Sequence, residues 1–415
     1  MATLFVPYNP AMQLGSGFNS FTQQLCKNNA VVRDPTDEAN ADKTFNGQAQ
    51  EVTYKTSAID KVTDITSAMN ISPAFAIKYD MLDARGNGDF IHTAKIKDSD
   101  VSFLISVRVV NEVVEDQSLN KFDSDYNPDD VRPEHIADAY GDSFISGFQE
   151  GGEFTAVISI KAKYRHKASN IKASAAIYFT TKCIMDADGE LKVDDISILE
   201  ENETTISVTW SGGSRELKRP EDGWTLETMR AAALKFPDLV ARTPTRTKAI
   251  LTRYSALQSF QPALVAGQSA TTLIPSYDKA EVYSAMLQEA YIDFKIIAKE
   301  PPGPLVEDQG QPSDSDDDPS VVAVEQDSSR RATRAYEPSR AGLETARRDV
   351  RSILNHIVAE VDAIARKPEL AADKTGPSPC YLSPSLFKEL SPESRPAHDS
   401  AGGSFSDDVG AISRP

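Results

Sequence analysis

The sequence is poor in cysteine and histidine and contains no long hydrophobic run. Its three cysteines, Cys26, Cys183 and Cys380, are too few and too widely spaced for a disulfide framework or a zinc site. No stretch approaches the ~20 apolar residues that a membrane-spanning helix requires. The first residues lack the basic and apolar regions of a secretory signal peptide. We therefore expect a protein with reduced thiols that is cytoplasmic or exported without a leader.

Sequence motifs of catalysis are also missing. The five histidines are scattered, and none forms a pair with metal-ligand spacing. No Gly-x-Ser-x-Gly element, phosphate-binding loop or dinucleotide fingerprint occurs. The segment Asp123–Asp130 is rich in carboxylates, but it lacks the central glycine and the final glutamate of a calcium loop. A solvated acidic loop is the better interpretation, and we expect no enzyme activity, cofactor or metal.

The charge of the chain is strongly negative. With 62 acidic and 44 basic residues, the formal net charge is −18. Nonspecific binding to nucleic acid or to anionic lipid favours basic surfaces, so this charge argues against both, and we expect no nucleic-acid partner. At 40% hydrophobic residues, the chain has enough apolar material to bury a core.

Composition divides the chain into four regions. Residues 1–300 show clear periodicity and predict a folded domain. Residues 301–338 are dominated by Pro, Ser, Asp and Gln and predict a disordered acidic linker. In residues 339–391, apolar side chains recur at three- and four-residue spacing up to Ile364, which predicts a helix over 339–366. Residues 392–415 predict a disordered tail.

The first region mixes helices and strands. Alternating apolar residues predict strands at 101–110, 154–163 and 204–210, with a further strand at 247–257. Helical spacing predicts helices at 132–140, 225–236 and 278–296. Long strands separated by helical insertions do not fit an alternating βαβ scheme, so we expect an α+β fold.

One short run carries more information than the rest of the chain. Tyr140-Gly141-Asp142-Ser143-Phe144 is followed, after six residues, by Gly151-Gly152. This run resembles the signature of the membrane attack complex/perforin (MACPF) family, which shares its fold with the cholesterol-dependent cytolysins. The family pattern is aromatic-Gly-Thr/Ser-His-aromatic, six residues, Gly-Gly. Asp142 and Ser143 depart from it.

Other segments resemble the same family in the same order. An opening Gly-x-Gly-aromatic-Asn element is formed by Gly15, Gly17, Phe18 and Asn19. Glu51–Thr56 resembles the first core strand, and Thr209–Gly213, with Gly212 and Gly213, resembles a later strand that ends in a glycine pair. Together they cover about residues 12–260, and the predicted helix at 278–296 closes the domain.

The resemblance implies a fold and a function. The fold is a bent, twisted four-stranded antiparallel sheet flanked by two helical clusters, followed by a C-terminal helical region. The clusters correspond to residues 58–99, the first helical cluster, and residues 167–202, the second helical cluster. In the family, such clusters unfurl into β-hairpins when the protein oligomerises on a lipid membrane, and Gly151-Gly152 corresponds to the hinge. A simple β-bulge at these glycines is an equal alternative.

Both clusters satisfy two periodicities. As strands, they alternate between apolar and more polar or smaller residues, which is the pattern of a membrane-spanning β-strand. The candidate membrane-inserting residues are Phe75, Ile77, Tyr79, Met81, Ala173, Ala175, Ile177 and Phe179. Short apolar runs often fit both periods, so amphipathic elements of a static fold remain an alternative.

Charge in the second helical cluster opposes membrane insertion. Glu190, Lys192, Asp194, Asp195 and Glu200 lie close together, and strict alternation puts one of the adjacent aspartates on the lipid side. The sequence therefore supports a pore-forming-like, toxin-like protein that oligomerises on a membrane. A non-lytic soluble scaffold that keeps the fold and binds a protein partner is the alternative.

Overall fold

The computed structural model describes residues 4–33, 50–79, 93–123, 133–164, 170–176, 202–213, 217, 221, 223–257, 259–260, 276–299, 336, 339–372 and 383–391. The expected acidic linker at 301–338, apart from Tyr336, lies outside these residues. So do the expected tail at 392–415 and all but the first residue of the carboxylate-rich loop at 123–130.

In this part of the chain, eight strands form one sheet whose strand pairs are all antiparallel. They are β1 (Leu4–Pro7), β2 (Gly17–Asn19), β3 (Gln24–Leu25), β5 (Glu51–Ile59), β6 (Val101–Glu115), β8 (Ser143–Lys161), β9 (Glu203–Ser211) and β10 (Thr245–Arg253). A separate pair consists of β4 (Val31–Arg33) and β7 (Leu119–Phe122).

The helices lie between and after these strands. They are α1 (Val62–Ala68), α2 (Pro73–Tyr79), α4 (Thr93–Asp98), α5 (Pro133–Tyr140), α8 (Leu226–Arg242), α11 (Asp278–Lys299), α12 (Arg340–Arg366) and α13 (Pro384–Leu390). Short 3₁₀ turns cover Tyr254–Ala256 and Pro368–Ala372. None of the helices in the described ranges has the length and apolar character needed to cross a membrane.

The expected four-stranded sheet is confirmed as β5-β6-β8-β9. β6 pairs with β5 along Ser102–Val110, and nearly the whole length of β6 pairs with β8. β9 pairs with the second half of β8, from Glu153 to Lys161. The sheet also continues beyond the prediction, because β10 pairs with the first half of β8 and β1 pairs with β10. β8 is therefore the central strand of both halves.

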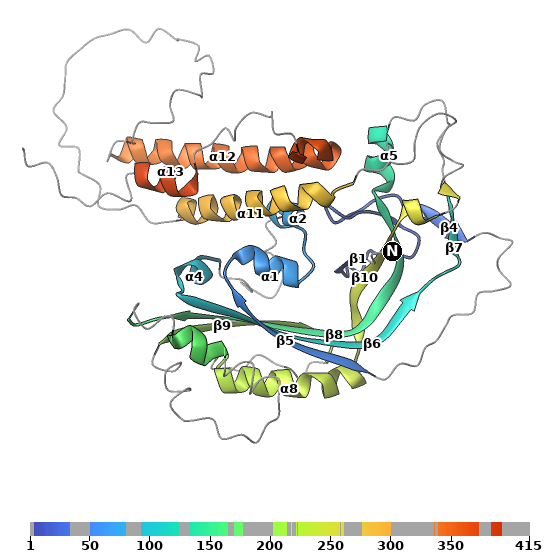
Figure 1. Cartoon of the computed structure of the whole chain (residues 1–415), viewed down its shortest axis with the longest axis horizontal. Coiled ribbons are helices and arrows are strands. Elements are labelled where there is room, and N and C mark those ends of the chain that lie inside the picture. The colour runs from blue at the N-terminus through green and yellow to red at the C-terminus, as the bar shows by residue number, and fades with distance from the viewer. Residues whose placement is uncertain are drawn as a thin grey trace, which may run out of the picture. The chain divides into compact units, whose positions relative to one another are not determined.

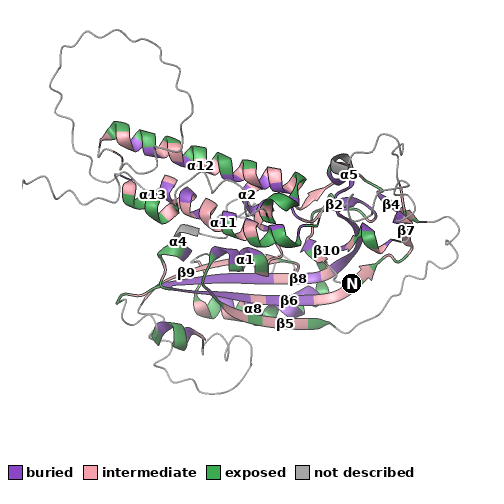
Figure 2. Ribbon diagram, turned by 45° about the horizontal axis from the view of Figure 1, so that its top comes forward, coloured by how far each residue is buried: buried purple, intermediate pink, exposed green. Residues whose placement is uncertain are grey.

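One face of the sheet is an apolar core. Alternate residues of β6 and β8, such as Phe103, Val107 and Phe154, point to the same side, as the period of two predicts. Helix α8 covers this face with buried residues that include Phe236 and Val240 (Figure 1). Figure 2 shows that the paired parts of β6 and β8 are buried. Burial of this face is the main hydrophobic contribution to the fold.

Helix α8 is longer than its sequence predicts. The expected end at Phe236 is wrong, because the helix continues past Pro237 to Arg242. Proline in a helix interior removes one backbone hydrogen bond. The following turn nevertheless stays helical because it buries Leu239 and Val240 against the sheet.

The opposite face is more polar and carries the first helical cluster. On β6 and β8, this face presents Ser102, Thr155 and Ser159, and the Ser102 hydroxyl donates to Ser159 Oγ at 3.3 Å. Helices α1 and α4 lie on this side of the sheet, across from α8 (Figure 1). The cluster is therefore packed on a surface with fewer large apolar groups than the α8 face offers.

The chain divides into two compact units. The first contains residues 1–292 and 356–376, and the second contains 293–355 and 377–415. In the second unit, the rings of Phe294 and Tyr336 lie 5.7 and 5.6 Å from that of Phe387. The hydroxyl of Tyr336 donates to Asp349 at 2.8 Å. The expected helix at 339–366 is confirmed as α12.

The α8 face predicts a large loss of stability on truncation of Phe154. This ring is fully buried, so Phe154→Ala should reduce the free energy of unfolding by about 3–5 kcal/mol. Phe5→Ala is the matched control, because Phe5 is 37% exposed and should cost far less. Urea unfolding followed by far-UV circular dichroism measures both. Equal losses in the two variants would contradict this assignment of the core.

Candidate functional site

The central strand changes its neighbour at Gly151-Gly152. On the same edge of β8, Gly151 pairs with Thr245 of β10, whereas Glu153 pairs with Ser211 of β9. On the other edge, β6 has a register shift at Asn111, opposite Glu150 and Gly151. The irregularity and the change of partner therefore coincide, and β8 turns out of the plane of the four-stranded sheet here (Figure 1). We call this region the sheet bend.

The two glycine pairs of the sequence meet at the sheet bend. A Cβ on Gly151 would lie 2.0 Å from the carbonyl oxygen of Val109. A Cβ on Gly212 would lie 2.7 Å from the carbonyl oxygen of Gly151, and Gly212 has a φ of +81°. Only glycine permits both this conformation and this backbone approach. On the core face, Gly152 is covered by Phe236 and Val240 of α8, and Gly213 N donates to Thr243 O at 3.0 Å.

The aromatic half of the signature lies at the start of β8, beside the N-terminal motif. β2 pairs with β8 through Gly17–Phe144 and Phe18–Ser143, and Gly15 N donates to Ile145 O at 2.8 Å. Tyr140 ends α5. The carbonyl of Tyr140 accepts a hydrogen bond from the hydroxyl of Tyr254. Gly141 N donates a hydrogen bond to Ala137 O, which closes the last turn of the helix. The two motifs, far apart in sequence, form one packed unit that holds this end of β8.

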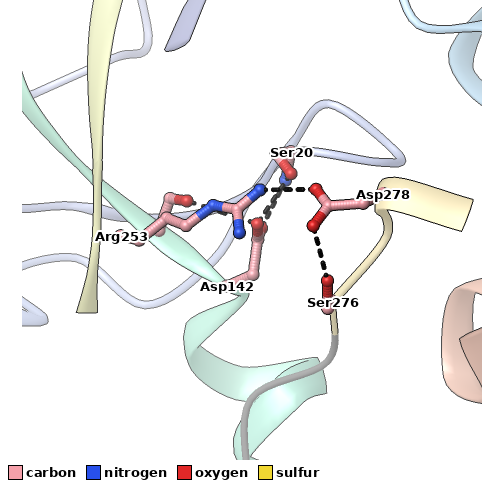
Figure 3. A network of polar contacts seen from close by, with 6 residues as sticks. Ser20, Asp142, Arg253, Ser276 and Asp278 are labelled. Carbon is pink, nitrogen blue, oxygen red and sulfur yellow. Dashed lines mark hydrogen bonds and ion pairs between the residues drawn. The ribbon is translucent and has the colours of Figure 1, made fainter. Parts of the chain in front are cut away.

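The departure at Asp142 creates a buried polar contact. Its carboxylate accepts hydrogen bonds from Ser20 N at 2.6 Å and Ser20 Oγ at 2.7 Å, and Ser143 Oγ donates to it at 3.3 Å. Asp142 is 3% exposed, and burial raises the pKa of its carboxyl group. Beside it, Arg253 donates to Asp278 at 2.9 Å, which joins the end of β10 to the start of α11 (Figure 3).

The structure places the candidate membrane-inserting residues in helices. Phe75, Ile77 and Tyr79 lie in α2, where Ile77 is buried and the rings of Phe75 and Tyr79 contact each other at 4.8 Å. Ala173 and Ala175 lie in a helical turn at 170–176, and Ala175 joins the apolar core under the sheet. The remaining predicted residues, Met81, Ile177 and Phe179, lie outside the described residues.

The two clusters occupy equivalent positions in the topology. The first lies between β5 and β6, and the second lies between β8 and β9. Because all four strands are antiparallel, both connections leave the sheet at the same end. They are also equal in length, since they comprise residues 60–100 and 162–202. Each connects two neighbouring antiparallel strands. A tight turn would be enough to join such strands, so both connections are much longer than the sheet requires.

A buried lysine ties the first helical cluster to the sheet bend. Lys248 of β10 is 1% exposed, and its Nζ donates a hydrogen bond to Oδ1 of Asn70, in the turn after α1. The same Nζ lies 3.1 Å from Oε1 of Glu153, the residue after Gly152. Glu153 also accepts from Arg108 Nε at 3.2 Å. Cluster, bend and neighbouring strands thus share one charged network.

Sequence reasoning missed this lysine, although a signal was present. Lys248 shares one face of β10 with Ile250, so it is a charge at a position where alternation predicts an apolar residue. Burial lowers the pKa of its amino group, and the carboxylate of Glu153 opposes that effect. Because an unpaired buried charge is costly, the ammonium group holds Asn70 and Glu153 in place.

Comparison with solved structures finds proteins of similar fold at very low sequence identity. Stonustoxin is 8% identical, with a TM-score of 0.41 over 94% of this chain and 44% of that chain. A protein with a MAC/perforin domain from Bacteriodes thetaiotaomicron VPI-5482 is 9% identical, with a TM-score of 0.33 over 70% of this chain and 65% of that chain. The human-specific toxin intermedilysin is 14% identical, with a TM-score of 0.31 over 60% of this chain and 50% of that chain.

This chain spans less than two thirds of the length of each of these three proteins. No family model and no curated protein matched the sequence. The fold is MACPF-like in the features described above, namely an antiparallel four-stranded sheet with a bend and two inserted clusters.

Close packing at the sheet bend predicts a specific penalty at Gly212. Gly212→Ala should reduce the free energy of unfolding by about 2–4 kcal/mol, since it combines a strained φ with a backbone clash. Gly223→Ala isolates the strain, because Gly223 has a φ of +88° and open space around it, and it should cost about 1 kcal/mol. Equal losses in urea unfolding would show that the two glycine pairs do not meet as described.

Burial of Asp142 predicts a characteristic pH dependence. A carboxyl whose folded-state pKa lies above its ordinary value of 3.8 stabilises the fold below pH 3.8, and this contribution is lost as the pH rises through the raised pKa. In Asp142→Asn, the amide oxygen can still accept from Ser20 N and the amide nitrogen can donate to Ser20 Oγ, but the group does not titrate. The stability of this variant relative to wild type should therefore increase from pH 4 to pH 7.

Asp278→Asn is the control of opposite sign. The hydrogen bond from Arg253 lowers the pKa of Asp278, so its contribution is present at neutral pH and is lost as the pH falls through the lowered value. The stability of this variant relative to wild type should decrease as the pH rises toward pH 4 and should change little from pH 4 to pH 7. Denaturant unfolding at each pH measures both differences, and a decrease for Asp142→Asn would contradict its buried environment.

Proposed function

We propose that this chain is a pore-forming-like protein that oligomerises on a membrane and converts its two helical clusters into β-hairpins. One observation supports this proposal above all. Two pairs of adjacent antiparallel strands, β5-β6 and β8-β9, are each interrupted at the same end by a long segment of equal length. If both segments became extended, all four strands would lengthen in the same direction without any change of neighbour.

The lengths of the segments are sufficient for this change. Each segment supplies two arms of about 20 residues, or roughly 65 Å at about 3.3 Å per residue. The apolar band of a membrane barrel is about 25 Å tall and needs only about 9–11 residues per strand. The rest of each arm would form the part of the barrel between the sheet and the bilayer. Closure of such a barrel requires several copies of the chain, because open strand edges are not tolerated in lipid.

The contacts of the first helical cluster are compatible with release. It lies on the more polar face of the sheet, and the polar tie through Lys248 and Asn70 can be exchanged for water. Release of the first cluster would leave the apolar core between the sheet and α8 in place, whereas conversion of the second cluster would withdraw Ile171 and Ala175 from that core. The proposed role is mechanical and needs no catalytic residue or cofactor.

A soluble interaction scaffold is the second candidate function. The observation that favours it is the density of charge near the end of the second helical cluster, from Glu190 to Glu200. These side chains would have to face the water-filled interior of a barrel, and one of Asp194 and Asp195 would face lipid. A scaffold would keep both clusters helical when it binds its partner.

Dye release from liposomes distinguishes these functions when it is combined with a reversible lock. Lys78 Nζ of α2 and Asp362 Oδ1 of α12 lie 2.7 Å apart, and both side chains are partly exposed. In a background with the three native cysteines changed to serine, Lys78→Cys and Asp362→Cys joined by a disulfide-containing bismaleimide should hold α2 in place. We expect the locked protein to release no dye from zwitterionic, anionic or sterol-containing vesicles, and we expect reductant to restore release.

A second disulfide provides the matched control. Ser102 and Ser159 lie on neighbouring strands that stay paired in both states, with their Oγ atoms 3.3 Å apart. A disulfide from Ser102→Cys and Ser159→Cys should leave dye release unchanged. Release by the cross-linked Lys78–Asp362 variant at the wild-type rate would contradict hairpin conversion. Absence of release from the unlocked protein on every vesicle would favour the scaffold.

A further inference from the structure

Helix α11 contacts both ends of the first helical cluster through one carboxylate. Glu289 Oε1 accepts a hydrogen bond from Thr63 N at 3.0 Å, in the first turn of α1. Glu289 Oε2 lies 3.6 Å from Nζ of Lys97 in α4. In a hairpin, α1 and α4 would become parts of opposite arms. The two arms therefore cannot extend while Glu289 holds both helices.

The last part of α12 contacts the middle of the same cluster. Lys78 of α2 forms an ion pair with Asp362 at 2.7 Å. Residues 356–376 belong to the same compact unit as the sheet and the cluster. Together, α11 and α12 contact α1, α2 and α4, which are the helices described in this cluster.

The two helices are fixed at a common anchor. The hydroxyl of Tyr277, just before α11, donates to the carbonyl of Ala365 in α12 at 2.8 Å and accepts from Asn19 Nδ2 at 3.2 Å. The ring of Tyr277 stacks on that of Phe21 at 4.8 Å. The anchor thus joins both helices to the N-terminal motif beside the fixed end of β8, and Phe21 O also accepts a hydrogen bond from Ser72 Oγ of the cluster at 2.6 Å.

We propose that residues 278–292 of α11 and 356–366 of α12 form a C-terminal strap that holds the first helical cluster in its helical state. The inference concerns regulation and rests on the proposed function only in its consequence for membranes. The contacts to the cluster include ion pairs from partly exposed groups, which contribute little individually. They also include a buried hydrogen bond from Gln288 Nε2 to Thr66 Oγ1 at 3.3 Å. Displacement of the strap would remove these restraints from α1, α2 and α4 while the sheet and α8 remain packed.

Hydrogen exchange in solution tests the strap without any membrane. Lys78→Glu reverses one charge of the Lys78–Asp362 pair and should speed amide exchange in α2 about fivefold, the factor expected from loss of one ion pair. Lys78→Glu combined with Asp362→Lys should restore the wild-type rate. Arg340→Glu is the matched control, because it changes the net charge equally at an exposed pair with Glu344, in the second compact unit. Exchange in β8 reports whether the fold is intact.

Glu289→Gln gives a second, milder variant in case Lys78→Glu fails to fold. The amide oxygen can still accept from Thr63 N, but the charge that faces Lys97 is removed, so exchange in α4 should increase more than exchange in α1. Unchanged exchange in the cluster of both variants, or a double variant that fails to restore the rate, would overturn the strap.

Dye release by the same variants separates the two proposals. Faster exchange together with faster release supports both. Faster exchange without any release from vesicles supports the strap and overturns the proposed function. Faster release with unchanged exchange overturns the strap and leaves the proposed function standing.

Discussion

The structure depends on one constraint, which is that β8 must satisfy its backbone hydrogen bonds with different neighbours along a single edge. β10 serves its first half and β9 its second half, so both neighbouring strands must end at the same point. The glycine pairs at 151–152 and 212–213 allow the three backbones to approach there. Helix α8 closes over the glycines on one face, and Lys248 lies beside them on the other. This arrangement also helps to position the first helical cluster, because Lys248 joins Asn70 of the cluster to Glu153 of the sheet.

The contacts on the two faces of the sheet differ in kind, and this difference separates a permanent part from a removable part. On the α8 face, large apolar side chains interdigitate, and their exposure would be costly. On the other face, hydroxyl groups, single ion pairs and a shared lysine contact the cluster, which also buries smaller apolar side chains such as Val62, Ile65 and Ile77. The polar contacts lose little when water replaces them, provided that they are released together with their partners. A segment that must leave the sheet without unfolding it would be expected on the second face.

Local sequence patterns predicted the elements better than their relationships. Alternation predicted β6, β9 and β10, and the family resemblance carried by Tyr140, Gly141 and Gly151 implied the bent sheet. The extension of α8 beyond Pro237 was missed because buried Leu239 and Val240 override the local effect of proline.

The contacts of Lys248 with Asn70 and of Glu289 with Thr63 join residues that lie 178 and 226 positions apart in the sequence. No periodicity encodes such pairs, so only the folded chain shows them. The same holds for Asp142, whose departure from the family pattern becomes a hydrogen-bond acceptor for Ser20.

The central claim is that the first helical cluster changes from helix to strand on a membrane. A cysteine scan from Pro73 to Tyr79, with an environment-sensitive fluorophore at each position in turn, tests it most directly. If the conversion occurs, labels at 75, 77 and 79 should enter lipid while labels at 74, 76 and 78 remain in water. This period of two is impossible for α2 as it stands. If the labels stay in water at every position on vesicles that bind the protein, or keep a helical period, the cluster does not convert.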